Sequence, residues 1–237
     1  TDIDNASYIG AVEAVDFELG ELINNPLIGK ISFKADVDGV GFTLEKLNSS
    51  VKGNVSKYEY NNYTYNNIDI NGLISEKHFD GFMEVNDQNL KLNFKGLADF
   101  STDVYTFNFN TNVDYCDLKA IRVFERDSVS NIKGEIAIDV KGNSIDDIVG
   151  TINFKNSFYA NHKTNYFFKD FNITSSFEDS TRTITINSSE IIEGRIRGKF
   201  KVNELLNLAQ NSIGSIYTNY KPFEVTPKQE LDFRFKI

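Results

Sequence analysis

Apolar and polar residues alternate with a period of two along most of this chain. Three clear runs lie at residues 31–37, 90–100 and 192–202, where apolar side chains and glycines occupy every second position. Because successive side chains of a β-strand point to opposite faces, the pattern predicts strands with one apolar and one polar face. Something must cover or occupy the apolar face, and its identity decides what the protein does.

The alternating runs are separated by turn sequences such as Asp38-Gly39, Asp80-Gly81 and Lys141-Gly142-Asn143. Short connections of this kind join antiparallel neighbours, so the fold class is predicted to be all-β. The predicted strands are residues 12–19, 30–38, 51–60, 63–74, 78–86, 90–100, 104–115, 131–141, 150–159, 166–177, 181–188, 191–202 and 229–237.

Three short segments have helical spacing instead. They are Leu19–Asn24, Leu118–Phe124 and Glu204–Asn211, and Asn203 is a candidate N-cap for the last of them. We therefore expect short helices interspersed among the strands.

The chain also contains an internal repeat. Asp36-Val37-Asp38-Gly39 matches Asp139-Val140-Lys141-Gly142, and Lys95-Gly96 matches Arg197-Gly198. The offset is about 103 residues, which predicts a module of about five or six strands and a short helix, joined edge to edge. The predicted units are approximately 12–112, 113–200 and 201–237, the last one truncated, within one continuous segment, 1–237, of a longer protein.

Composition excludes several functions. The net charge of −9, without a cluster of basic residues, argues against a nucleic-acid partner. Cys116 is the only cysteine, and His78 and His162 lack nearby residues at metal-ligand spacing. No nucleophile motif or phosphate-binding glycine loop occurs, so we expect no enzyme activity and no cofactor. No stretch of about 18 apolar residues is present.

Two interpretations of the apolar face remain open at this point. The first is a β-sandwich in which a second sheet covers it; such a binding or adhesion module would present Tyr58, Tyr60, Tyr63 and Tyr65 to a glycan or protein. The second is a curled open sheet whose apolar interior forms a groove. Serial repeats favour the groove, because a closed sandwich has no use for modules added edge to edge.

Several stretches resemble the TamB-like translocation and assembly proteins, which belong to the AsmA-like superfamily of bridge-like lipid-transfer proteins, and their style is that of the Bacteroidota branch. The resemblance covers most of the chain and consists of structural repeat motifs. The stretches are Gly29–Val37 with Gly41–Asn48, Tyr63–Gly72, Leu90–Asp99 and Gly214–Tyr220.

The resemblance implies a repeating antiparallel β-groove, or β-taco, within an inner-membrane-anchored periplasmic protein. Such a protein bridges the two membranes, carries phospholipid acyl chains in its groove and supports outer-membrane biogenesis. Its outer-membrane partner is an Omp85-type assembly protein or the lipoprotein variant, reached through parts outside this segment. Whether the cargo is lipid or an outer-membrane protein strand stays open.

The apolar phase of the strands supplies the predicted groove lining. Short helical segments with Leu118, Ile121 or Leu205 would either plug the groove or cap an open apolar edge. Separately, Asp127-Ser128-Val129 resembles a Bacteroidota O-glycosylation signal, with Ser128 as the acceptor. The predicted lining residues are Ile31, Phe33, Ala35, Val37, Leu90, Leu92, Phe94, Phe107, Phe109, Ile136, Ile138, Ile152, Phe154, Phe171, Ile173, Ile184, Ile186, Ile196 and Phe200.

Overall fold

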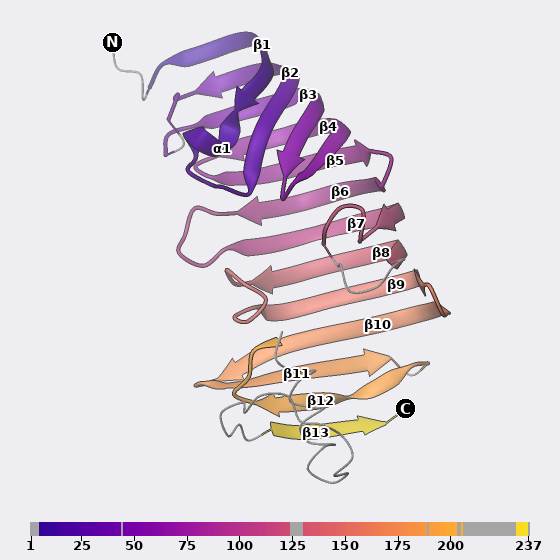
Figure 1. Cartoon of the computed structure of the whole chain (residues 1–237). Coiled ribbons are helices and arrows are strands. Elements are labelled where there is room, and N and C mark those ends of the chain that lie inside the picture. The colour runs from indigo at the N-terminus through magenta and orange to yellow at the C-terminus, as the bar shows by residue number, and fades with distance from the viewer. Residues whose placement is uncertain are drawn as a thin grey trace.

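The structure is a computed structural model that describes residues 5–43, 45–123, 130–188, 190–202, 205 and 231–236. Within these residues, one antiparallel sheet of 13 strands runs in sequence order from β1 to β13 (Figure 1). The elements are β1 (Ser7–Glu18), α1 (Leu19–Leu22), β2 (Ile28–Val40), β3 (Asn48–Tyr60), β4 (Tyr63–Ser75), β5 (His78–Asn86), β6 (Leu90–Asp99), β7 (Thr106–Asp117), β8 (Ser130–Lys141), β9 (Val149–Asn161), β10 (Asn165–Glu178), β11 (Thr181–Ser188), β12 (Ile192–Gly198) and β13 (Leu231–Lys236).

The all-β prediction is confirmed, and each predicted strand is present with shifted ends. The largest shift at a C-terminal end is in β12, predicted to reach residue 202 but ending at Gly198. Each strand pairs with its sequence neighbours, and β1 and β13 lie at opposite ends of the open sheet (Figure 1). The first strands curve round, so that the sheet is curled rather than flat (Figure 1).

Local irregularities bend many of the strands. The pairing register shifts between Ala14 and Phe17 in β1 and between Val113 and Cys116 in β7. Asp16, Asn67 and Asn156 have φ of 49°, 54° and 45°, a left-handed conformation that Asn and Asp tolerate better than most residues. Bulges of this kind increase the twist and bend of a strand, which supplies the curvature of the sheet.

The helical predictions are confirmed in part. The helix α1 forms where the first was predicted, but the prediction at 118–124 is wrong over the described residues 118–123, which form turns. There the Asp117 carboxylate accepts hydrogen bonds from the backbone N–H groups of Lys119 and Ala120. The main-chain carbonyl of Asp117 accepts one from the N–H group of Ile121. Such a local turn satisfies the backbone without the cost of nucleating a longer helix. The third prediction, 204–211, lies outside the described residues except for Leu205.

The residues matched in the internal repeat lie six strands apart. Asp36 in β2 corresponds to Asp139 in β8, and Gly96 in β6 corresponds to Gly198 in β12. The division into repeat units stays a prediction.

Candidate functional site: an open apolar groove

Strand pairing aligns the apolar side chains into rows that cross the sheet. Within each row, every residue lies directly opposite the next one on the neighbouring strand. The longest row extends from β1 to β13. Its members are Gly10, Val37, Val51, Gly72, Gly81, Gly96, Phe109, Ile138, Ile152, Ile173, Ile186, Gly194 and Phe235.

The 18 predicted lining residues that lie in strands share this face, as their pairing shows. Phe200 lies beyond the end of β12, where its ring is 5.9 Å from the Arg182 guanidinium. The prediction omitted several of the most buried members of the same face, although the alternation in residues 51–60, 63–74 and 78–86 points to some of them. They are Val55, Ile68, Val85, Val113 and Cys116.

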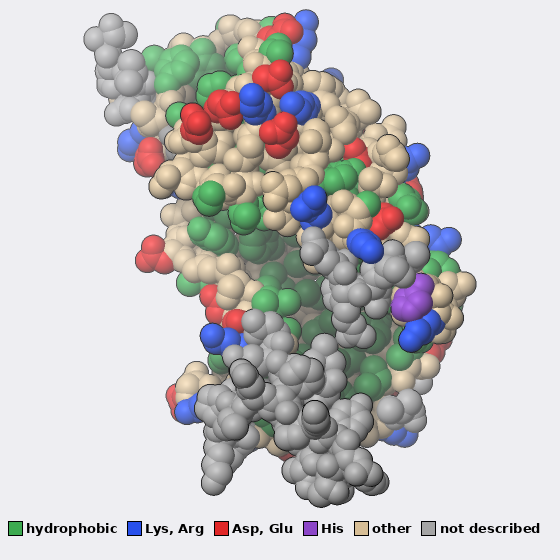
Figure 2. Space-filling model, viewed as in Figure 1, with side chains coloured by type: hydrophobic (Ala, Val, Ile, Leu, Met, Phe, Trp, Pro, Cys, Tyr) green, Lys and Arg blue, Asp and Glu red, His purple; other side chains and the backbone are tan. Residues whose placement is uncertain are grey.

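The apolar face is only partly covered by the described residues. Phe33, Phe94 and Ile152 are half-buried, whereas the short side chain of Ala35 is 4% exposed. The described strands form one sheet, with no second sheet over it among the described residues. At one end of the groove, where the sheet curls, Tyr63 and Tyr65 of β4 pack against Val113 and Cys116 of β7. Figure 2 shows the hydrophobic side chains gathered in a hollow behind a polar rim. The face is therefore an open groove over the part of the chain that the structure describes.

A stripe of glycines crosses the floor of the groove. Gly72, Gly81 and Gly96 lie opposite one another on β4, β5 and β6. A Cβ at Gly72 or Gly81 would lie 2.8 or 2.9 Å from the Phe79 ring, so this ring covers these two glycines, while Gly96 lies against Phe109. The same cover for strand glycines is used to stabilise curved sheets. The floor here consists of backbone and the flat aromatic rings that lie over it.

One edge of the groove is lined by a turn that folds back onto the apolar face. Ile121 is 6% exposed and packs against Val113 and Cys116. Asn61, in the turn between β3 and β4, donates a hydrogen bond from Nδ2 to the Arg122 carbonyl at 3.3 Å. Burial raises the pKa of the Cys116 thiol to about 12. This packing is what a cap over an apolar edge requires.

The opposite edge is held by a buried arginine. Arg182 is 3% exposed and donates to Ser175 Oγ at 3.0 Å and to the carbonyls of Asp146 and Ile148 at 3.2 and 3.4 Å. Its guanidinium also lies 5.5 Å from the Phe177 ring. Burial lowers the pKa of Arg182, and the nearby Asp146 charge opposes that effect. Arg182 thus ties the turn between β8 and β9 to the inner face.

A buried carboxylate organises the turn between β5 and β6. Asp87 is 1% exposed and accepts hydrogen bonds from the Tyr63 hydroxyl, from Asn66 N and Nδ2 at 3.1 Å, and from Asn89 N at 2.9 Å. Burial alone would raise the pKa of Asp87, but these hydrogen bonds together hold it below its usual value. Burial and the bond to Asp87 raise the pKa of Tyr63 to about 12. The network fixes the strand ends on this edge.

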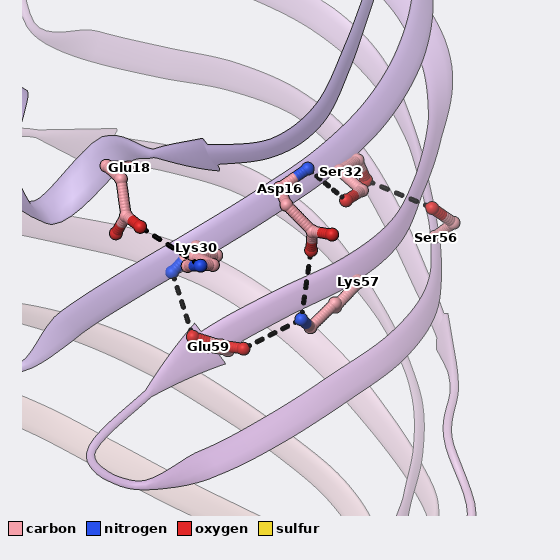
Figure 3. A network of polar contacts seen from close by, with 7 residues as sticks. All are labelled: Asp16, Glu18, Lys30, Ser32, Ser56, Lys57 and Glu59. Carbon is pink, nitrogen blue, oxygen red and sulfur yellow. Dashed lines mark hydrogen bonds and ion pairs between the residues drawn. The ribbon is translucent and has the colours of Figure 1, made fainter.

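On the polar face, ion pairs and hydrogen bonds join β1, β2 and β3 at the N-terminal end of the sheet (Figure 3). Lys57 lies 2.8 Å from Glu59 and 3.0 Å from Asp16, and Lys30 lies 3.1 Å from Glu18. Asp16 N also donates to Ser32 Oγ at 2.8 Å. Together these contacts hold the bulged strand β1 to β2 and β3 just before α1 begins.

Shallow hollows also lie on the polar face. One of about 460 Å³ is lined by amide and charged side chains that include Asn110, Asn153, Lys95 and Glu135. A polar lining of this kind suits water rather than an acyl chain. The apolar groove is therefore the candidate functional surface.

The remaining sequence features concern a glycosylation site, metal ligands and membrane-spanning segments. Ser128 lies outside the described residues. Over the described ranges, no group of three His, Cys, Asp or Glu side chains could hold a metal ion. No helix in the described part of the chain has the length and apolar character that crossing a membrane requires.

Comparisons with protein-family models, curated proteins and solved structures find no match for this chain.

Proposed function

We propose that this chain is a segment of a TamB-like bridge whose apolar groove conducts phospholipid between two membranes. The observation that carries the proposal is the row of apolar residues and glycines that crosses β1 to β13 without a charged side chain. The row lies in an open groove rather than in an enclosed core. Twelve steps between 13 strands give a groove about 58 Å long at the usual strand spacing.

The groove has the physical properties that a sliding lipid needs. Each CH₂ group removed from water contributes about 0.8 kcal/mol, so an acyl chain of ordinary length is held firmly on an apolar floor. A floor of similar residues offers similar contacts at each step, so movement along it costs little. The polar outer face keeps the sheet hydrated on the other side.

The alternative from the sequence was a sandwich module that presents surface tyrosines. Tyr58 and Tyr65 instead pack against the apolar cluster around Val55, Ile68 and Val85. The described residues also provide no second sheet to close a sandwich. Both observations favour the groove.

The cellular setting is part of the same proposal. We place the segment in the periplasm, within an inner-membrane-anchored protein that supports outer-membrane biogenesis. The Omp85-type partner, or its lipoprotein variant, would meet other parts of that protein. Neither a cofactor nor a nucleic acid is needed for this role, and no catalytic step is involved.

The proposal is tested by lipid capture. The purified chain is incubated with vesicles of phosphatidylethanolamine and phosphatidylglycerol, separated from them by gel filtration, and its bound phospholipid is measured by mass spectrometry. We expect at least one phospholipid per chain, displaced by a long-chain hydrocarbon competitor. A well-folded chain that emerges without phospholipid contradicts the proposal.

A further inference from the structure

Tyrosines gather at one edge of the groove. Cross-strand pairs join Tyr58 to Tyr65, Tyr60 to Tyr63, and Tyr159 to Tyr166. The turns after β3 and β9 lie on the same side of an antiparallel sheet, so all three pairs flank one edge, here called the tyrosine rim. The first and third pairs are also in ring contact, with centroids 6.3 Å apart in each. The tyrosine rim consists of Tyr58, Tyr60, Tyr63, Tyr65, Tyr159 and Tyr166.

The opposite edge is built mainly from phenylalanine. Phe100 packs edge-on against Tyr105 and Phe107, with centroids 5.1 and 5.5 Å apart, and Phe177 lies beside Arg182. Phenylalanine supplies the same apolar surface as tyrosine without a hydrogen-bond donor. This edge also holds Tyr8 and Tyr105, and the Arg182 guanidinium there donates to Ser175, Asp146 and Ile148 of the protein itself. The two edges therefore differ in how densely phenol hydroxyls are placed along them rather than in apolar character.

The rim hydroxyls differ in what they bind. The Tyr63 hydroxyl is engaged by Asp87. The hydroxyls of Tyr58, Tyr60 and Tyr65 have no hydrogen-bond partner among the described residues. None of these three oxygens is fully buried, so each can be reached by a ligand. Burial raises the pKa of Tyr65 to about 12 and also raises that of Tyr58. The phenols of Tyr58 and Tyr65 therefore stay protonated and can donate.

A tyrosine has an apolar ring and a polar tip, which suits a boundary between an acyl chain and water. Phosphate and ester oxygens of a phospholipid are acceptors without donors of their own. A neutral phenol can donate to these oxygens without placing a charged side chain beside the apolar groove. A row of such donors along one edge gives a lipid a preferred orientation across the groove.

We propose that the tyrosine rim binds phospholipid headgroups, so that phosphate and ester oxygens accept hydrogen bonds from Tyr58, Tyr60 and Tyr65 while the acyl chains point toward the phenylalanine edge. This inference rests on the proposed function of the groove. Tyr166, which is 43% exposed, lies six strands further along, or about 29 Å, and forms a second contact point for headgroups, while the hydroxyl of its neighbour Tyr159 accepts a hydrogen bond from Ser130 Oγ at 3.2 Å.

The test uses two photoreactive phosphatidylethanolamines, one with a diazirine in the headgroup and one with a diazirine at the end of an acyl chain. Each is bound to the full chain, irradiated, and mapped by peptide mass spectrometry. We expect the headgroup probe to label segments 58–66 and 159–167, and the acyl-chain probe to label segments nearer the phenylalanine edge. Equal labelling of both edges by the headgroup probe overturns the inference.

A triple variant, Tyr58→Phe with Tyr60→Phe and Tyr65→Phe, keeps the rings and removes the donors. We expect phosphatidylethanolamine binding to weaken about tenfold, the effect of losing one or two hydrogen bonds, while Tyr105→Phe at the other edge leaves it unchanged. Unchanged binding in the triple variant contradicts the inference. If free glycerophosphoethanolamine at the same concentration displaces phosphatidylethanolamine, the site recognises a free phosphate ester rather than a lipid whose acyl chains lie in the groove. That result would also overturn the inference. If neither probe labels the wild-type chain, the proposed function itself fails.

Discussion

Replacement of Phe94 by aspartate is expected to stop phospholipid passage while the sheet still folds. Phe94 lies on the groove floor, half-buried, with its ring 4.6 Å from that of Phe109. A carboxylate placed there without a partner puts a charge in the path of the acyl chains, and dehydrating such a charge costs several kcal/mol. The barrier is local, so one substitution should block the whole path.

The measurement is phospholipid transfer in cells that carry Phe94→Asp in the native protein, with folding checked by circular dichroism of the purified chain. Phe33→Asp, on another part of the floor, should behave in the same way. Lys95→Asp is the matched control, because its side chain lies next along the same strand but on the exposed polar face. Undiminished lipid transfer through a folded Phe94→Asp protein would reject the groove as the path.

Loss of Asp87 is expected to produce the largest change in stability. Asp87→Ala leaves the Tyr63 hydroxyl and the backbone N–H groups of Asn66 and Asn89 without their acceptor. Each buried donor left unpaired costs about 1–3 kcal/mol, so we expect the free energy of unfolding to fall by about 3–5 kcal/mol in urea denaturation. The exposed Asp80, on β5, gives the control variant Asp80→Ala, whose unfolding free energy should stay within about 0.5 kcal/mol of wild type.

The same carboxylate predicts a pH dependence. Because the pKa of Asp87 is lower in the folded chain than its usual value of 3.8, its contribution to stability is complete above that usual value. The contribution is lost as the pH falls through the folded pKa. Between pH 5 and strong acid, wild-type stability should therefore fall more steeply than that of Asp87→Asn. Parallel curves for the two proteins would show that Asp87 is not the responsible group.

The alternation of residues was sufficient to predict the strands and the face that lines the groove. It failed where a bulge changes the phase of a strand. In β3 the side chains of Val55 and Tyr58 both face the groove although they are three residues apart, because the pairing register with β2 shifts between them. Tyr58 and Tyr60 are therefore turned into the groove, whereas a strict period of two had placed them outside. No local signal for such a bulge is visible in the Ser56 region of the sequence.

The polar contacts at the groove edges were harder to predict. Asp87 is 24 residues from Tyr63 and 21 from Asn66, and strand pairing alone brings them together. Arg182 did leave a signal, because it has the same phase as Ile184 and Ile186 and so falls on the apolar face. A charged residue in the apolar phase of a strand indicates a buried anchor that needs partners.

The central claim, a continuous lipid path, is tested most directly by photo-crosslinking in the native envelope. A photoreactive amino acid is placed at Phe33, Phe94 and Ile196 on the groove face, and at Lys34 and Lys95 on the polar face as controls. Phospholipid captured at the first three positions and not at the two controls is the result that the account predicts. Crosslinks only within the protein at all three groove positions would mean a closed, dry core and would contradict it.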